Sequence, residues 1–152
     1  MAAAIAFVQN DIKKVLAYST MSQLAYIFTG LGSALWFYNN DEHHAAAVVF
    51  GSSMFHLFNH AMAKGMLFMA SGSVIHEVHH AHDHLHHGHG DGHEHDFDPQ
   101  DMRNMGGLAS KMPVTATAMM FGSMSIIGIP LIGGFWSKDC LLYTSDAADE
   151  VL

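Results

Sequence analysis

Residues 45–75 read AAAVVFGSSMFHLFNHAMAKGMLFMASGSVI, and this stretch decides the fold. It runs for 31 residues, and its only formal charge is Lys64. A helix needs about 20 predominantly apolar residues to cross a bilayer, so the stretch is long enough to span one. Two further runs, 15–38 and 112–137, contain no formal charge over 24 and 26 residues. Three such runs predict an all-α membrane protein with three transmembrane helices.

The composition supports this prediction. Only 13% of the 152 residues are charged, against about 25% in a typical soluble domain, so buried helices of a large soluble protein are the weaker interpretation. The sequence contains six Lys and Arg residues and 14 Asp and Glu residues, for a formal net charge of -8. This balance argues against a nucleic-acid partner, because phosphate contacts need basic side chains. A single Cys excludes a disulfide framework and a Cys-based metal site.

Basic residues near the ends of the runs predict the orientation. They are Lys13, Lys14, Arg103 and Lys111. Three consecutive spans place these residues on one side of the membrane, whereas the opposite connection, residues 39–44, has none. Because basic loops stay in the cytoplasm, we expect residues 76–111 to be cytoplasmic and the protein to lie in the inner membrane of a bacterium.

His56, His60 and Lys64 follow one another at intervals of four residues within the second run. This spacing puts them on one stripe of a helix, with His56 and Lys64 about 12 Å apart along its axis. An intramembrane Lys usually faces the protein interior or a water-filled cavity, and His titrates near neutral pH. We interpret the stripe as a path for protons. A hydrogen-bonding set between helices is an alternative, as is zinc held by the two histidines, which lacks a third ligand.

Residues 127–134, IGIPLIGG, predict a break in the third helix near Pro130. Proline removes a backbone donor and clashes with the preceding turn, and irregular backbone at membrane depth is tolerated where it lines a cavity. Lys138 and Asp139 follow at once as a charged pair. An ordinary proline kink near the end of a helix is the alternative.

Residues 76–101 contain ten His and seven carboxylates but no Lys or Arg. Gly88, Gly90, Gly92 and Pro99 argue against a regular element, so we expect a flexible, solvated loop from residue 76 onward. His-rich tracts chelate zinc, nickel or copper as a property of their composition. We favour a tolerated cytoplasmic insertion over a dedicated metal function.

Five motifs together resemble one family, the antiporter-like membrane subunits of respiratory complex I (NADH–quinone oxidoreductase), and within it the L-type subunits. They are QNDIKKVLAYSTMSQL at 9–24, FHLFNHA at 55–61 followed by Lys64, SGSVIH at 71–76, DMRNMGGL at 101–108 and GFWSKD at 134–139. The resemblance implies proton translocation, driven by electron transfer from NADH to quinone in other subunits. It implies a larger antiporter-like helical bundle, with other membrane subunits of the complex and the lipid bilayer as partners. Flavin and iron–sulfur clusters are expected in those other subunits, so no cofactor or metal site is expected in this chain.

The resemblance also assigns residue roles. Lys64 matches a central proton-carrying lysine, His56 and His60 match the connecting polar path, and Lys138 and Asp139 match a discontinuous helix near the exit route. Asp11 and Lys13 belong to the first motif and are expected only to support the path. As a bare pattern, they are equally typical of topological anchors.

The sequence departs from the family pattern in two places. The glutamate and lysine of the family's first half-channel are absent, so we expect residues 1–139 to be a fragment that cannot pump alone. Residues 140–152, CLLYTSDAADEVL, resemble a translated sequencing adapter and are expected to be non-native. Two other functions stay open: the large subunit of a multisubunit sodium/proton antiporter, and a metal-ion transporter or sensor that uses the His-rich loop.

Overall fold

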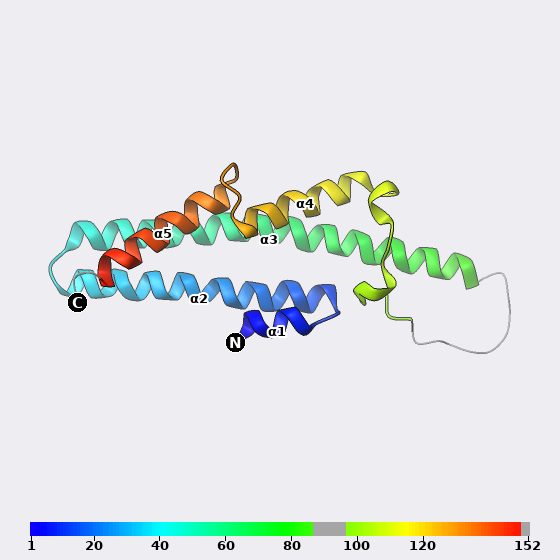
Figure 1. Ribbon diagram of the computed structural model, residues 1–152, viewed down its shortest axis with the longest axis horizontal. Coiled ribbons are helices and arrows are strands. Elements are labelled where there is room, and N and C mark those ends of the chain that lie inside the picture. The colour runs from blue at the N-terminus through cyan, green and yellow to red at the C-terminus, as the bar shows by residue number, and fades with distance from the viewer. Residues whose placement is uncertain (87–96, 150–152) are drawn as a thin grey trace.

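The computed structural model describes residues 1–86 and 97–149, which form five α-helices (Figure 1). The helices are α1 (Ala2–Val8), α2 (Ile12–Asn39), α3 (His43–His86), α4 (Pro113–Ile127) and α5 (Gly133–Asp149). Two short 3-10 helices, Met102–Asn104 and Leu108–Ser110, precede α4. The only β-type pairing among the described residues is an isolated bridge between Asp11 and Asp101. The prediction of an all-α fold is confirmed for this part of the chain.

Helix α3 is the axis of the arrangement, because α2, α4 and α5 all pack against it. Helix α2 runs antiparallel along one side of α3, and α4 and α5 follow one another along another side (Figure 1). Helix α1 lies beside the beginning of α2. Because α5 also contacts α2, three helices meet around the middle of α3, where the candidate site lies.

Helices α2 and α3 form a hairpin with defined ends. The Asp11 side chain caps α2 by accepting hydrogen bonds from the backbone N–H groups of Lys13 and Lys14, at 2.9 and 3.2 Å. Such a cap satisfies donors that the first turn of a helix leaves free. Farther along, a Cβ added to Gly30 would lie 2.3 Å from the Ser53 hydroxyl oxygen. The hairpin therefore packs too closely at this point for a larger residue.

Helix α3 extends farther than the sequence predicted. It contains 44 residues, which corresponds to about 66 Å at 1.5 Å per residue, and it continues to His86 instead of giving way to a loop at His76. Residues 76–86 contain no Gly or Pro, and the first glycine comes at Gly88. The expectation of a loop beginning at residue 76 is therefore wrong for 76–86, and residues 87–96 lie outside the described part.

The predicted break in the third helix is confirmed. Helix α4 ends at Ile127, and Gly128 has a φ of 89°, a left-handed conformation that favours glycine. The N–H of Gly128 donates to the carbonyl of Met124 at 3.1 Å, which closes the last turn. Helix α5 begins at Gly133. Pro130 lies in the interruption, where its missing N–H costs no helical hydrogen bond.

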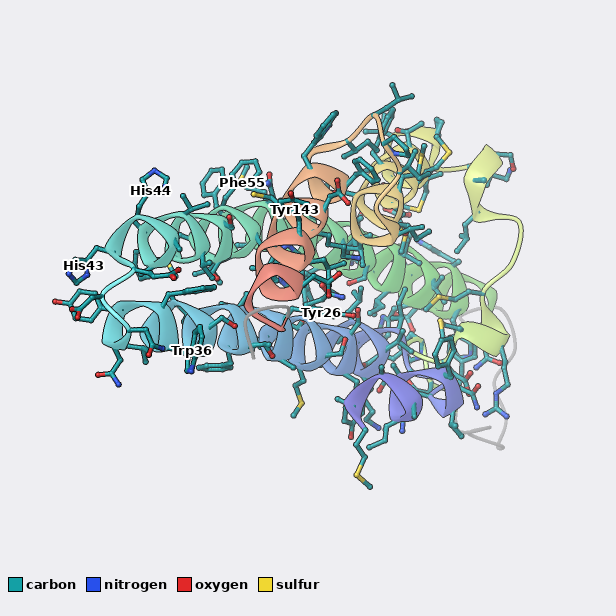
Figure 2. All side chains as sticks on the ribbon, turned by 60° about the vertical axis from the view of Figure 1, so that its left-hand side comes forward. Tyr26, Trp36, His43, His44, Phe55 and Tyr143 are labelled. Carbon is teal, nitrogen blue, oxygen red and sulfur yellow. The ribbon has the colours of Figure 1, made fainter. Side chains whose placement is uncertain are left out.

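The helical assembly buries several polar side chains among apolar ones and exposes many large apolar side chains. The buried polar side chains are Ser52, Ser53, His56, His60, Lys64, Ser71 and Ser137. Large apolar and aromatic side chains project outward instead, among them Phe55 and Trp36 (Figure 2). Within the described residues, no helix is both long enough and apolar enough to be recognised as a membrane span.

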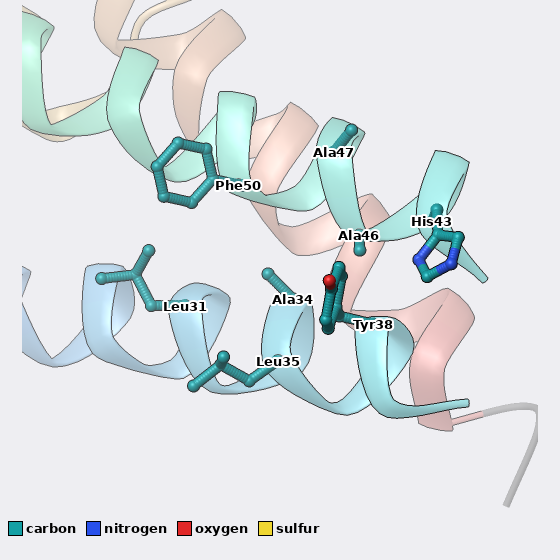
Figure 3. Close-up of a pocket in the computed structure, with 8 residues that line it drawn as sticks. All are labelled: Leu31, Ala34, Leu35, Tyr38, His43, Ala46, Ala47 and Phe50. Carbon is teal, nitrogen blue, oxygen red and sulfur yellow. The ribbon is translucent and has the colours of Figure 1, made fainter. Parts of the chain in front are cut away.

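The end of the α2–α3 hairpin holds an apolar groove with a volume of about 520 Å³ (Figure 3). It lies between residues 31–38 of α2 and residues 43–50 of α3. Its lining is Leu31, Ala34, Leu35, Tyr38, His43, Ala46, Ala47 and Phe50. The groove contains no constellation of catalytic side chains, so the candidate site lies elsewhere.

Candidate functional site

The predicted stripe of titratable residues lies inside the helical assembly. His56, His60 and Lys64 are only 3%, 8% and 5% exposed. The rings of His56 and His60 are stacked, with their centroids 6.2 Å apart. Neighbouring apolar residues of α3, such as Ala63 and Leu67, are also buried, and this places the whole stripe on the packed face of the helix.

His56 has a hydrogen-bonding partner at each ring nitrogen. Its Nδ1 lies 3.0 Å from the hydroxyl oxygen of Ser137 on α5. Its Nε2 lies 3.2 Å from Oε1 of Gln23 on α2. Contacts from two other helices therefore fix the plane of this imidazole.

Lys64 donates a hydrogen bond from Nζ to the backbone carbonyl of Leu16 on α2, at 3.0 Å. The Thr20 hydroxyl donates to the same carbonyl at 2.8 Å. Within residues 1–86 and 97–149, no carboxylate forms an ion pair with Lys64. A buried ammonium group without a counter-ion is costly, and this arrangement is typical of a group that changes its charge during function.

Lys138 reaches the same region from the other side of the break. Its Nζ donates to the carbonyl of Ile126, near the end of α4. A small polar cavity of about 10 Å³ lies next to it, roughly the volume that one water centre occupies. Its lining consists of Gln23, His56, Asn59, His60, Ala63, Ser125, Ile126, Gly134, Ser137 and Lys138. Residues from all four long helices therefore meet at one point.

Close packing holds α5 in this position. A Cβ added to Gly134 would lie 1.9 Å from the backbone carbonyl oxygen of Ser125, a distance that no side chain can accommodate. Only glycine permits the beginning of α5 to approach α4 in this way. The glycine pair after Pro130 therefore serves packing as well as the break itself.

Two buried polar atoms at the site lack a hydrogen-bonding partner within the described residues. They are Nδ2 of Asn59 and Nε2 of His60. Buried polar groups are nearly always hydrogen-bonded, and exceptions call for an explanation such as a functional role. Both residues line the small polar cavity, so the unpaired atoms belong to the same place as His56 and Lys138.

The other predicted site residues lie outside this cluster. Asp139 is exposed and does not line the cavity. Asp11 caps α2 and forms an ion pair with Lys14, its Oδ2 lying 3.5 Å from Nζ. Lys13 is exposed at the same end of α2. The structure thus places Asp11 and Lys13 at the beginning of α2, outside the buried stripe.

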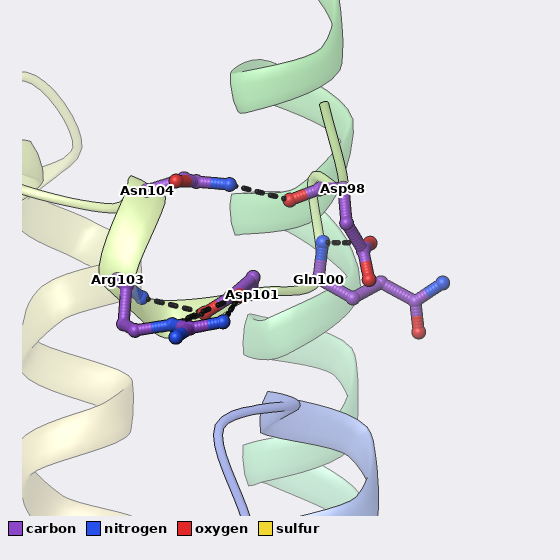
Figure 4. A network of polar contacts seen from close by, with 5 residues as sticks. All are labelled: Asp98, Gln100, Asp101, Arg103 and Asn104. Carbon is purple, nitrogen blue, oxygen red and sulfur yellow. Dashed lines mark hydrogen bonds and ion pairs between the residues drawn. The ribbon is translucent and has the colours of Figure 1, made fainter. Parts of the chain in front are cut away.

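Asp11 also belongs to a clasp, formed by residues 10–12 and 98–104, that ties the beginning of α2 to the segment before α4. The N–H of Ile12 donates to the carbonyl of Gln100 at 3.1 Å, and that of Met102 donates to the carbonyl of Asn10 at 2.9 Å. Arg103 forms an ion pair with Asp101 at 2.6 Å (Figure 4). Hydrogen bonds from the Arg103 side chain and backbone hold the pKa of Asp101 below its usual value.

The exposed histidines of α3 form pairs but no complete metal site. His76 and His80 have ring centroids 4.4 Å apart, and Nδ1 of His79 lies 3.2 Å from Oδ2 of Asp83. Among residues 1–86 and 97–149, no three His, Cys, Asp or Glu side chains converge as metal ligands would. The remaining histidines of the tract, between residues 87 and 96, lie outside the described part.

Sequence reasoning did not single out Gln23, Asn59 or Ser137 as site residues. Each is an uncharged polar residue in a mostly apolar run, and each lies within one of the motifs quoted above. Asn59 lies three residues after His56, and Ser137 immediately precedes Lys138. Their contacts join residues far apart in the sequence, so spacing alone could not predict them.

The chain matches a described protein family over nearly its whole length. The family "NADH:quinone oxidoreductase/Mrp antiporter, TM", a transmembrane family, covers residues 1–151. Over 154 residues, the chain is 41% identical to NAD(P)H-quinone oxidoreductase chain 5 of Synechocystis, with 100% of this chain and 19% of the relative aligned. It is 39% identical to NADH-quinone oxidoreductase subunit L of Rhodobacter capsulatus, covering 97% of this chain and 18% of the relative.

A relative named as an NADH-ubiquinone oxidoreductase chain gives a similar result. The chain is 40% identical to NADH-ubiquinone oxidoreductase chain 5 of Arabidopsis thaliana over 142 residues, covering 93% of this chain and 16% of the relative. The chain therefore spans about a fifth of the length of the curated relatives it matches.

Proposed function

The chain belongs to the NADH:quinone oxidoreductase/Mrp antiporter transmembrane family, and on that premise we propose that it is a segment of the proton-translocating L-type subunit of NADH–quinone oxidoreductase. The observation that carries the proposal is the buried line of His56, His60 and Lys64 on one helix, with Lys138 beside it. Electron transfer from NADH to quinone would take place in other subunits, where flavin and iron–sulfur clusters would lie. In this chain the reaction is the movement of protons.

The proposal places three spans in the membrane, at residues 15–38, 45–75 and 112–137. The distribution of side chains along the middle of α3 supports it. This part of the helix buries Ser53, His60 and Lys64 and exposes Phe55, Phe58 and Met69. Apolar side chains on the outside of a helical assembly favour contact with lipid. The His-rich segment would then face the cytoplasm of a bacterium, as the positions of Lys13 and Arg103 favour.

The buried groups suggest how a proton would pass. Stacked imidazoles at His56 and His60 can each accept and release a proton, and Lys64 follows one helical turn farther along. Among the described residues, none of these groups forms an ion pair with a carboxylate, so none is held in one charge state in that way. Repulsion between adjacent cations would then favour stepwise transfer over simultaneous charging.

Lys138 and Asp139 would continue the path across the interrupted helix. Lys138 lines the polar cavity with both histidines, whereas Asp139 is exposed here and would act where a neighbouring segment of the complete subunit covers it. Asp11 and Lys13 would support the path by holding the end of α2. Protons are the transported species, and other membrane subunits of the complex and lipid are the partners.

The proposal also covers the last residues of the sequence. Residues 1–139 would be native sequence and 140–152 foreign, which the codons of the gene would test.

A sodium/proton antiporter subunit is the alternative within the family, but the relatives named above are quinone oxidoreductase chains. Genes for quinone oxidoreductase subunits beside this one would support the main proposal, and genes for antiporter subunits would overturn it.

The decisive experiment is Lys64→Ala in the full-length subunit, assembled in its complex in inverted membrane vesicles. We expect NADH-driven proton uptake per NADH oxidised to fall about tenfold, because a central proton carrier is lost. Lys111→Ala is the matched control, since it removes an exposed Lys outside the buried stripe, and it should pump like the unchanged protein. Unchanged pumping in Lys64→Ala would contradict the proposal.

A deletion separates proton transport from a metal-centred function. Removing residues 79–95 from the full-length subunit takes away most of the His-rich tract while leaving the buried stripe. We expect NADH-driven pumping to survive. Loss of pumping together with loss of zinc binding, in a complex that still assembles, would favour the metal-ion transporter or sensor.

A further inference from the structure

Ser137 contacts His56 from a different helix and is fully buried, with 0% of its surface exposed. Its hydroxyl oxygen lies 3.0 Å from Nδ1 of His56 and 3.2 Å from the carbonyl oxygen of Gly134. A hydroxyl group has one hydrogen to donate but can also accept. Ser137 therefore faces two groups, the imidazole and the carbonyl, that compete for a single hydrogen.

When His56 is charged, both of its ring nitrogens carry hydrogens and must donate. Nε2–H then donates to Oε1 of Gln23, at 3.2 Å, and Nδ1–H donates to the hydroxyl oxygen of Ser137. Ser137 in turn donates its own hydrogen to the carbonyl of Gly134. Every donor of the imidazolium thus has an acceptor in place.

When His56 is neutral, one ring nitrogen becomes an acceptor. Gln23 keeps the hydrogen on Nε2, because its Oε1 can only accept. Nδ1 then needs a donor, and the hydroxyl of Ser137 can supply one by turning its hydrogen away from Gly134. Both charge states are therefore satisfied without moving a heavy atom, and the close contact of Gly134 with Ser125 keeps α5 in place.

Among the described residues, none of the other groups around His56 can both accept a hydrogen bond from the charged ring and donate one to the neutral ring as Ser137 does. On α3 the titratable neighbour is His60, with Lys64 beyond it, and on α5 the charged neighbour is Lys138. Helix α2 faces the ring with Gln23, and α4 has no ionisable side chain. Ser137 is thus the hydroxyl group beside the ring that can both accept and donate.

We propose that Ser137 is a positioning residue for His56, whose hydroxyl accepts from the charged ring and donates to the neutral ring, so that His56 can change its charge without losing a hydrogen bond. This inference rests on the proposed function. Because Ser137 immediately precedes Lys138, the change of partner also occurs in the first turns of the helix that carries the next titratable group.

The test compares Ser137→Ala and Ser137→Cys in the full-length subunit within its assembled complex. Proton uptake per NADH oxidised is measured in inverted vesicles from acidic to alkaline pH. We expect Ser137→Ala to lower pumping about three- to tenfold, as expected for one lost hydrogen bond. The charged ring loses a stronger hydrogen bond than the neutral ring does, so the substitution disfavours the charged state of His56. The loss of pumping should therefore appear first at alkaline pH, where that state is already scarce. Ser137→Cys fills the same space with a weak donor. Its proton uptake per NADH oxidised should lie between that of Ser137→Ala and that of the unchanged protein.

Ser71→Ala is the matched control. Ser71 is 1% exposed and its hydroxyl donates to the Phe68 carbonyl at 2.9 Å, so this variant also removes a buried hydroxyl from a helix. It should pump with the unchanged pH profile. If Ser137→Ala does not assemble, Ser137→Cys provides the same comparison without a cavity.

Two outcomes would overturn the inference: an unchanged pH profile in both Ser137 variants, or a loss that is equal at every pH, which a merely structural role would produce. The Lys64→Ala variant separates this failure from failure of the proposed function. If Lys64→Ala abolishes pumping while both Ser137 variants keep the unchanged profile, only the role of Ser137 is refuted.

Discussion

Helix α3 carries two stripes with the same spacing and opposite surroundings. His56, His60 and Lys64 are buried between α2 and α5, whereas His76, His80 and His84, also four residues apart, are exposed. The spacing is identical, so it cannot by itself define a proton path. The contacts from other helices distinguish the two stripes, since Ser137, Gln23 and the Leu16 carbonyl all reach the first.

The largest effect on assembly is expected from Gly134→Ala, which would displace α5 from the buried stripe. The new methyl group would lie 1.9 Å from the Ser125 carbonyl oxygen, so α5 could not keep its position beside α3. We expect little or no assembled subunit in membranes, measured by immunoblotting of the purified complex.

Gly72→Ala is the control for that variant. A Cβ at Gly72 meets nothing within 4 Å, and replacing a helical Gly by Ala usually stabilises a helix by about 0.5–1 kcal/mol. It should assemble normally. Normal assembly of Gly134→Ala would show that α5 does not need this close packing.

The next largest effect is expected when the two stripes are compared directly, by measuring proton pumping in His60→Gln and in His80→Gln. Glutamine keeps hydrogen-bonding capacity but does not titrate, so only proton transfer is removed. We expect His60→Gln to lower NADH-driven pumping about tenfold and His80→Gln to leave it unchanged. Equal effects of the two substitutions would show that burial does not separate the stripes.

A smaller effect is expected from Asp101→Asn, which weakens the clasp beside the exposed stripe. Because the folded-state pKa of Asp101 is lowered, its ion pair with Arg103 is present above the usual carboxyl pKa of about 4 and is lost as the pH falls through the lowered value. Amide exchange at Met102, which donates to Asn10, should therefore rise in the variant at neutral pH and in the unchanged protein only in acid. Equal protection in both proteins at neutral pH would contradict this.

The smallest effect is expected when His76, His80 and His84 are all replaced by alanine. Alanine is the best helix former, and none of these side chains is buried. Proton pumping and assembly should match those of the unchanged complex in the same vesicle assay. A marked loss of pumping would assign the exposed stripe a part in proton movement after all.

Local chemistry allowed the sequence to predict much of this arrangement. The break near Pro130 and the common face of His56, His60 and Lys64 follow from proline geometry and helical periodicity, and both are present in the structure. The predicted loop began too early, because its glycines start only at Gly88. The partners of His56 could not be predicted, since Gln23 and Ser137 are 33 and 81 residues away from it along the chain.

The clasp has a consequence for how the chain tolerates change in length. Residue 86 ends a helix that is continuous with His56 and Lys64, and residues 98–104 are tied back to the beginning of α2. Insertions or deletions between these two fixed points would alter neither the register of α3 against α2 nor the direction in which the buried stripe faces. Related sequences can therefore vary the number of histidines in this stretch while the interior stays the same.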